Sequence, residues 1–351
     1  MKEQKNYIIN GNMDFFMEGN KAAVANNVYG GTLVRHNKVG SAVFGLLQET
    51  TIVPTPTNIG DPKFRDLVIR SATSLHFDCS TASASPAAGD YVVDWQFIEG
   101  HELQEIQGRY VTVSTLVYAT KVGTMCVVFQ NSGQDRSYIQ EVEIEAANIW
   151  HYKYFKIRLA DTGGTWDYTT GIGLRVGIVK QAGATFQGSA GSWITGNKLA
   201  TSNQTNYAAL TSDSIYVGQM QIVEGEKPIR FQRAGENIEG ELAKISRWYE
   251  KTYDDTVVPG TVTLVGAWRN FPGVTTYRHG ILFKQIKARI PTITCYSSNN
   301  GASGNIYQNG QANAAATTPA VGQGGFTIDA TVTTSNDYVF VHYTADARFY
   351  T

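Results

Sequence analysis

The chain of 351 residues is 42% hydrophobic and 11% aromatic, which is enough to build folded cores, and its length predicts two domains rather than one. Lys and Arg total 29 against 30 for Asp and Glu, and a formal charge of −1 excludes recognition of nucleic acid or an anionic membrane through net charge. The N-terminus has no apolar run of signal-peptide length and no segment approaches the length that spans a bilayer, so we expect a soluble protein made in the cytoplasm.

The first part of the chain predicts β-strands joined by turn-rich loops. NYIINGNMDFF, from Asn6 to Phe16, is expected to open the fold as a strand with an Asn-Gly turn inside it, and FRDLVIRSA, from Phe64 to Ala72, to be the next strand. Stretches rich in Pro, Ser and Ala predict loops at 54–62 and 80–89. Further strands follow at regular intervals: 90–100, 109–120, 124–131, 137–146, 150–160 and 172–181. Many short strands without helices between them predict a β-sandwich.

The stretch from Ile215 to Tyr253 closes this sandwich and carries the helix of the chain. Its first residues alternate as a strand, which Pro228 is expected to end. Beyond Gly235, apolar side chains recur at spacings of four, three and four, which predicts one stripe of a helix: Ile238, Leu242, Ile245 and Tyr249. Gly240 costs this helix about 1 kcal/mol relative to Ala. We therefore expect the helix to depend on packing against the domains that it joins or against a neighbouring subunit.

From Asp255 onward the pattern predicts a small β-domain. Its strand candidates are 261–268, 280–286, 292–297, 324–329 and 337–345. The Gly-, Asn-, Ala- and Thr-rich stretch from Asn299 to Gly325 suits either a mobile loop or close packing against symmetry mates. The expected architecture is all-β: a jelly-roll sandwich over 1–232, a connecting helix over 233–254 and a C-terminal β-domain over 255–351.

Sequence motifs give catalysis little support. The six His never form H-x-x-H or H-E-x-x-H, and neither a G-x-S-x-G elbow nor a phosphate-binding loop occurs. Three glutamates alternate with apolar residues on one predicted strand: Glu141, Glu143 and Glu145. A shared solvated face explains them better than a carboxylate pair that flanks a sugar bond. Four further residues cluster before the strand at 109–120: Glu99, His101, Glu102 and Glu105. This cluster indicates a turn rather than an acid–base or metal site.

Metal sites and disulfides are not expected either. Cys79, Cys126 and Cys295 are odd in number and widely spaced, which favours buried thiols over a disulfide framework or a zinc site. Asp161 and Asp167 could contribute to a calcium site, but two carboxylates fall far short of the roughly six to eight oxygens that calcium takes. We expect no metal and no cofactor.

Aromatic residues in loops are the candidate carbohydrate-binding residues. Trp166, Tyr168 and Trp193 are flanked by Gly, Ser, Asp and Thr, and exposed rings can stack on the apolar face of a sugar. The alternative is that each ring plugs the open end of the sandwich. A second group lies on one face of a predicted strand, where core packing explains it: Trp150, Tyr152 and Tyr154.

NYIINGNMDFF and the Ile215–Tyr253 segment resemble the two ends of a bacteriophage tail, fibre and virion-surface family, whose members begin INGNMDIWQRG and carry a helix ending CQRYYEK. The similarity continues through PGTVTLVGAWRNF, IPTITCYSSNNGASG and HYTADARF, and so spans nearly the whole chain in order. The first half also resembles carbohydrate-binding modules of the jelly-roll type. Met17 to Gly19 and the pair Ile245-Ser246 depart from the family's pattern.

This resemblance implies a non-enzymatic structural protein of the phage particle surface, on tail or capsid. Its partners would be other virion proteins and host or environmental glycans, and it would be a homo-oligomer, with a trimer favoured. The helix stripe Ile238, Leu242, Ile245 and Tyr249 would then lie at or beside a subunit or domain interface. One alternative is a purely structural virion connector that binds no sugar, and another is a polysaccharide-degrading tail enzyme.

Overall fold

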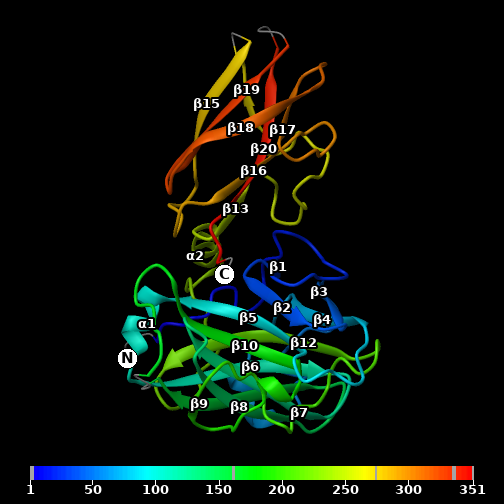
Figure 1. Cartoon of the computed structure of the whole chain (residues 1–351), viewed down its shortest axis with the longest axis vertical. Helices are drawn as coiled ribbons and strands as arrows, with labels where there is room; N and C mark the ends of the chain where they lie inside the picture. The colour runs from blue at the N-terminus through cyan, green and yellow to red at the C-terminus, as the bar shows by residue number, and fades with distance from the viewer. Residues whose placement is uncertain (1–3, 160–162, 273–274, 334–336, 350–351) are drawn as a thin grey trace. The chain divides into compact units, whose positions relative to one another are not determined.

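The computed structural model describes residues 4–159, 163–272, 275–333 and 337–349 (Figure 1). Nearly all of its regular structure is β, as the sequence predicts. The chain forms two compact units, the first comprising Met1–Asp14 with Asn20–Glu241 and the second Phe15–Gly19 with Leu242–Thr351. No helix within the described ranges is long and apolar enough to cross a membrane.

The first unit is an antiparallel sandwich of the jelly-roll class. One sheet has seven strands in the order β1 (Val28–Gly30), β2 (Val34–Val39), β5 (Tyr91–Glu99), β10 (Ile172–Ala182), β7 (Gly123–Asn131), β8 (Arg136–Ile144) and β11 (Trp193–Thr195). The other has five strands in the order β3 (Val43–Glu49), β4 (Ser74–Thr81), β12 (Ser214–Glu224), β6 (Tyr110–Ala119) and β9 (Trp150–Arg158).

The central strands of each sheet are covered on both faces. Between the sheets, Phe129 meets Phe155 with ring centroids 5.9 Å apart. The segment that follows β10 places Phe186 and Leu199 on the other face of the seven-stranded sheet, and residues 52–68 cover the other face of the five-stranded sheet. Strand β10 is consequently buried along its whole length, which explains its nearly continuous apolar sequence.

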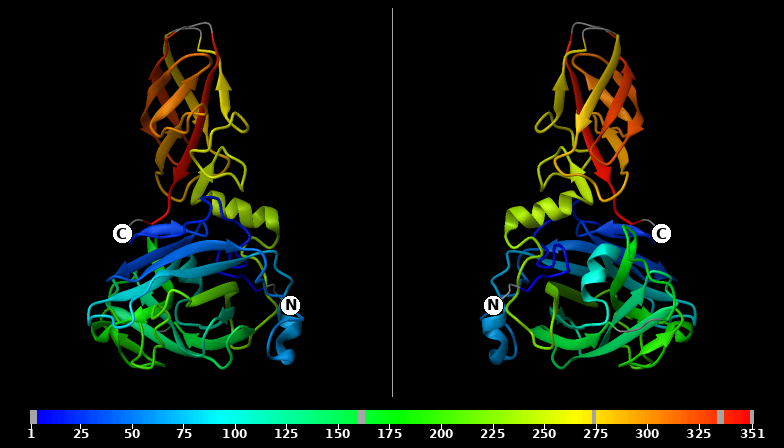
Figure 2. Two further views of the ribbon diagram at one scale, coloured as in Figure 1. Left: turned by 90° about the vertical axis from the view of Figure 1, so that its right-hand side faces the viewer. Right: turned by 90° about the vertical axis from the view of Figure 1, so that its left-hand side faces the viewer.

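The second unit is smaller and is built on one antiparallel sheet of eight strands, which run from yellow to red in Figure 2. Its main order is β13 (Tyr249–Lys251), β20 (Val339–Asp346), β17 (Asn305–Gln308), β18 (Asn313–Val321), β19 (Gly325–Thr331) and β15 (Thr276–Leu282). Two more strands, β14 (Trp268–Asn270) and β16 (Thr292–Tyr296), pair with β20. Its core gathers Tyr277, Ile306, Phe326 and Val341, which are all buried.

The helix predicted over 233–254 is shorter in the structure, where α2 spans Ile238–Ser246. Beyond it the chain extends as β13 and pairs with β20, so sheet hydrogen bonds replace the last helical turns. The Trp and Tyr residues there favour strands, which is why the pairing wins. Gly240 is required rather than merely tolerated, because a Cβ at this position would lie 2.1 Å from the carbonyl oxygen of Gly235.

The stripe expected on this helix divides among different environments. Ile245 and Tyr249 are buried in the single chain, and Tyr249 belongs to β13 rather than to the helix. Leu242 is half-buried, and Ile238 is 47% exposed. A continuous apolar stripe over four helical positions is therefore wrong.

The first two strands predicted from the sequence, at 6–16 and 64–72, are wrong. Asn6 to Phe16 is irregular, because Asn10 and Met13 adopt positive φ angles of 59° and 58°. Phe64 lies in a short helix, η1 (Pro62–Leu67), instead of a strand, since the Asp61 side chain accepts from the Lys63 amide and caps it. Strands β1 to β4 were not predicted.

Two further differences concern short elements. The cluster at Glu99–Glu105 expected to be a turn forms the helix α1 (Gly100–Ile106), beside the described N-terminus (Figure 1). The stretch expected to be a loop from Asn299 to Gly325 contains β17 and β18, and the proline within β18 is tolerated at a register shift between Thr317 and Ala320.

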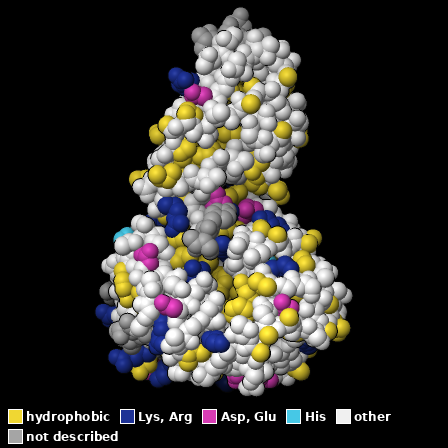
Figure 3. Space-filling view, viewed as in Figure 1, with side chains coloured by type: hydrophobic (Ala, Val, Ile, Leu, Met, Phe, Trp, Pro, Cys, Tyr) yellow, Lys and Arg dark blue, Asp and Glu magenta, His cyan; other side chains and the backbone are white. Residues whose placement is uncertain are grey.

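Charges are scattered over the molecular face drawn in Figure 3, where Lys and Arg lie among Asp, Glu and uncharged side chains. This agrees with the formal charge of −1. The three cysteines are free and buried, as predicted. Burial raises the pKa of Cys79 to about 11 and of Cys295 to about 12, so these thiols are unreactive at neutral pH.

Candidate functional site

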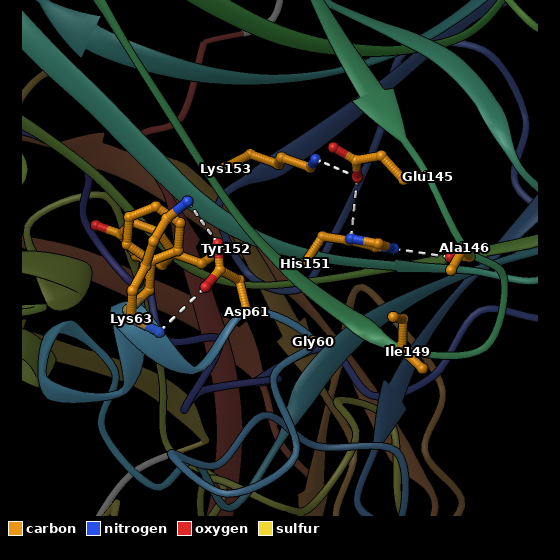
Figure 4. Close-up of a pocket in the computed structure, with 10 residues that line it drawn as sticks. Gly60, Asp61, Lys63, Glu145, Ala146, Ile149, His151, Tyr152 and Lys153 are labelled. Atoms are coloured by element: carbon orange, nitrogen blue, oxygen red, sulfur yellow. Dashed lines mark hydrogen bonds and ion pairs between the residues drawn. The ribbon is translucent and has the colours of Figure 1, made fainter.

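A pocket of about 320 Å³ opens beside β9 in the first unit (Figure 4). One side is formed by residues before and at the start of η1, between Gly60 and Phe64, and the other by residues between Glu145 and Lys153, around the start of β9. Although these two segments lie far apart in the chain, Ile59 forms a parallel bridge with Trp150. The Gly60 amide donates to the Trp150 carbonyl at 2.8 Å, which fixes the floor of the pocket.

A chain of polar groups lines one wall. The Glu145 carboxylate pairs with the Lys153 amine and lies 3.2 Å from Nδ1 of His151 (Figure 4). Nε2 of His151 donates to the Ala146 carbonyl at 2.7 Å, since a carbonyl can only accept. The imidazole is therefore held in one orientation between a fixed acceptor and a carboxylate.

The opposite wall combines charge with aromatic rings. Lys63 pairs with Asp61 at 2.6 Å, and its amine lies 4.7 Å from the centre of the Phe64 ring. The Phe64 ring contacts Tyr152 at 4.9 Å and Tyr154 at 5.6 Å between centroids. Tyr154 is 46% exposed, whereas Tyr152 is buried. Core packing was therefore the right interpretation for Tyr152, but Tyr154 extends an aromatic surface from the pocket to solvent.

Both carboxylates of the pocket are set to remain ionised. The Lys63 ammonium lowers the pKa of Asp61 below its ordinary value. Burial alone would raise the pKa of Glu145, but the hydrogen bond from Lys153, a backbone hydrogen bond and the nearby positive charge together outweigh it, and the net pKa is lowered. At neutral pH these groups are hydrogen-bond acceptors and poor proton donors.

Two of the three predicted aromatic residues come together elsewhere in the first unit. The rings of Trp166 and Trp193 pack edge to face with centroids 5.5 Å apart, and Tyr138 lies 5.8 Å from Trp193. Both tryptophans are half-buried, and their indole N–H groups donate to backbone carbonyls, of Gly163 and Arg158. Within the described ranges Tyr168 has no ring contact with either tryptophan, and its carbonyl accepts from Gln104. No single platform joins all three.

The acidic groups considered from the sequence are paired inside the chain. Lys5 binds both Glu102 and Glu105, and the Tyr7 hydroxyl donates to Glu105 at 2.9 Å. Asp167 accepts from the amide and hydroxyl of Thr169, as in a tight turn. Asp161 lies outside the described residues. Across the described ranges no three His, Cys, Asp or Glu side chains gather as metal ligands would.

Sequence reasoning missed the pocket beside β9. It assigned Asp61 to Phe64 to a loop and a strand, and Glu145 to a solvated face. The available signal was the Asp-Pro pair at 61–62, which is typical of a helical N-cap and first turn and would have excluded a strand there. No local pattern indicates that Ile59 bridges to Trp150.

Neither a protein-family model nor a curated protein matches the chain. Among solved structures, a family 4 carbohydrate-binding module is 12% identical, covering 62% of this chain and 99% of its own, with a TM-score of 0.31. A family 11 module of a Clostridium thermocellum cellulase is 9% identical over 61% and 95%, with a TM-score of 0.29. A tandem of family 22 modules from Paenibacillus barcinonensis is 8% identical over 99% of each chain, also with a TM-score of 0.29. All these TM-scores are below 0.5, so the likenesses carry no argument about function.

Proposed function

We propose that the first unit binds carbohydrate, without cleaving it, at the pocket beside β9. The observation that carries this proposal is the pairing of aromatic rings with fixed polar groups around one concave surface. A sugar ring presents an apolar C–H face, which the Phe64 and Tyr154 rings can cover, and a rim of hydroxyls, which Asp61, Glu145 and Lys153 can bind.

The electrostatics favour binding over hydrolysis. Glycoside hydrolysis requires one carboxyl group that is protonated at the working pH and a second that is ionised. Asp61 and Glu145 both have lowered pKa values and a lysine partner, so neither is prepared to give a proton to a leaving group. The polysaccharide-degrading alternative therefore lacks its acid in this pocket.

A role on the surface of a phage particle is part of the same proposal and rests on the sequence resemblance. Self-association would suit such a role, since many copies on one particle multiply weak binding at each site.

Large apolar side chains of the second unit are exposed in the single chain: Val262, Leu264, Val265, Leu282, Ile286 and Ile290. These side chains could contact another subunit in a homotrimer, together with Ile238 and Leu242. Ile245 and Tyr249 could not, because they are buried within the single chain. Light scattering would test this, and a stable monomer at micromolar concentration would contradict it.

Glycan-array binding tests the sugar site. Phe64→Leu keeps an apolar side chain against Tyr152 but removes the flat ring, and it should lower retention at least about tenfold, equivalent to 1.4 kcal/mol. The paired variant Trp166→Ala with Trp193→Ala is the control and should leave retention unchanged. Loss of binding only in the tryptophan variants would move the site to the predicted aromatic residues.

Two outcomes would replace the proposal altogether. A chain that binds no glycan on a broad array would favour the purely structural connector. Reproducible shortening of a polysaccharide, abolished by Glu145→Gln, would establish the enzyme alternative.

A further inference from the structure

The interior of the first unit holds three titratable side chains on three neighbouring strands. Lys180 of β10 contacts Asp94 of β5 directly through Nζ and Oδ2. His36 of β2 places Nδ1 2.9 Å from the other oxygen of Asp94. The side chains of Lys180 and His36 are completely buried, and that of Asp94 is 1% exposed.

The surroundings of the Lys180 amine are aromatic. Nζ lies 3.6 Å from the centre of the Phe77 ring and 5.9 Å from that of Phe44, both on the facing sheet. Among the described residues Asp94 is the one hydrogen-bond partner of this amine. An ammonium group with so few acceptors is costly to bury, so the neutral amine is favoured. Burial accordingly lowers the pKa of Lys180 well below its ordinary value.

The imidazole of His36 is also neutral, since burial lowers its pKa to about 3. Nε2 of His36 has no hydrogen-bond partner among the described residues. The hydrogen bond of the ring is the one between Nδ1 and Asp94. The Asp94 carboxyl group thus contacts a neutral lysine amine through one oxygen and a neutral imidazole through the other, and all three side chains are buried.

We propose that Lys180 and Asp94 condense to an amide that links β10 covalently to β5. The amine nitrogen attacks Cγ of the protonated Asp94 carboxyl group and forms the new C–N bond. One oxygen of the carboxyl group then leaves as water, carrying its own hydrogen and one proton from the amine. His36 relays that proton between nitrogen and leaving oxygen through Nδ1.

This step needs no oxidant, reductant or activated donor. One amine and one carboxylic acid give one amide and one water, and no electrons are transferred. In bulk water the reverse reaction is favoured, but water is excluded from this interior. The amide also replaces two groups that are expensive to bury as charges with a neutral one.

Intact mass spectrometry of the full chain under denaturing conditions tests the proposal without any variant. The expected mass is lower than that of the sequence by one water molecule. Proteolysis should then yield a branched peptide in which a segment containing Lys180 is joined to one containing Asp94. A full-length mass without this loss, or a water loss located elsewhere in the chain, would overturn the proposal.

Variants identify the reacting groups. Lys180→Met and Asp94→Ala should each show the unreduced mass of their own sequences, and His36→Gln should show a smaller cross-linked fraction at equal times after synthesis. Lys287→Met, which removes a lysine that the second unit buries beside Glu250, is the matched control and should keep the full water loss. Cross-linking that survives Asp94→Ala would also contradict the assignment.

Discussion

The two units each bury a lysine beside a carboxylate, but they surround the two pairs differently. In the second unit, Lys287 donates to Glu250 at 2.6 Å and to the Ser246 carbonyl at 2.5 Å, and Glu250 also accepts from the Tyr343 hydroxyl at 2.9 Å. In the first unit, Lys180 meets Asp94 and aromatic rings. Hydrogen bonds from the protein must replace lost water if a buried ion pair is to persist. Both pairs are buried, so burial does not distinguish them. The number of polar neighbours does: it favours the ionised form of the Lys287–Glu250 pair and the neutral form of the Lys180–Asp94 pair.

Breaking the pair of the first unit should have the largest effect. Asp94→Ala leaves the neutral Lys180 amine buried without a hydrogen-bond partner, which should lower the free energy of unfolding by about 1–3 kcal/mol. Loss of the proposed cross-link should remove up to about 4 kcal/mol more by freeing the unfolded chain. Guanidinium unfolding followed by tryptophan fluorescence measures the sum. A loss below about 1 kcal/mol, typical of an ordinary substitution, would contradict both terms.

Breaking the pair of the second unit should cost less. Glu250→Gln removes the counter-charge of Lys287 and should destabilise the second unit by about 3 kcal/mol. Adding Lys287→Met should restore at least half of that loss, because no charge is then left buried. Adding Lys180→Met to Asp94→Ala should recover much less, since apolar packing cannot replace the proposed covalent link. Equal recovery in the two units, measured by denaturant unfolding, would remove the distinction between them.

Acidification should affect the first unit through His36. Its folded pKa of about 3 lies below the ordinary value of 6.5, so between these values the unfolded chain binds a proton that the folded chain does not. The contribution of His36 to the free energy of unfolding is therefore complete above pH 6.5. It decreases by about 1.4 kcal/mol per pH unit as the pH falls towards 3. His36→Gln should therefore make the free energy of unfolding depend less on pH in this range. Urea unfolding at several pH values measures this dependence. An unchanged slope would mean that His36 is already protonated when folded.

The smallest change in stability is expected at an ion pair open to solvent. Glu145→Gln disrupts the pair with Lys153 at the pocket beside β9, and because Glu145 is exposed the free energy of unfolding should change by less than about 0.5 kcal/mol. Glycan binding should nevertheless weaken by roughly tenfold if the carboxylate accepts a sugar hydroxyl. Thermal unfolding and array retention, measured on the same preparation, separate the two effects. A large loss of stability would mark Glu145 as structural.

Much of the sandwich was predictable because its central strands carry strong local patterns. Strands β5 to β10 and β12 have alternating or continuous apolar residues bounded by turn residues, and burial on one or both faces produces that pattern directly. The edges were harder. Strand β18 is rich in Ala and Thr and contains a proline, so nothing local distinguishes it from a loop, and only pairing with β17 and β19 makes it a strand.

The sequence by itself determined the all-β class, the buried thiols and the loop position of Trp166, since each depends on composition or short-range periodicity. Tertiary structure alone decided which distant side chains meet. Asp61 faces the same pocket as Glu145 because Ile59 bridges to Trp150, and Trp166 contacts Trp193 while Tyr168 does not. Lys180 reaches Asp94 only through the register of β10 on β5, which shifts between Val179 and Gln181. Strand register is set by packing over a whole sheet, so no local pattern specifies these contacts.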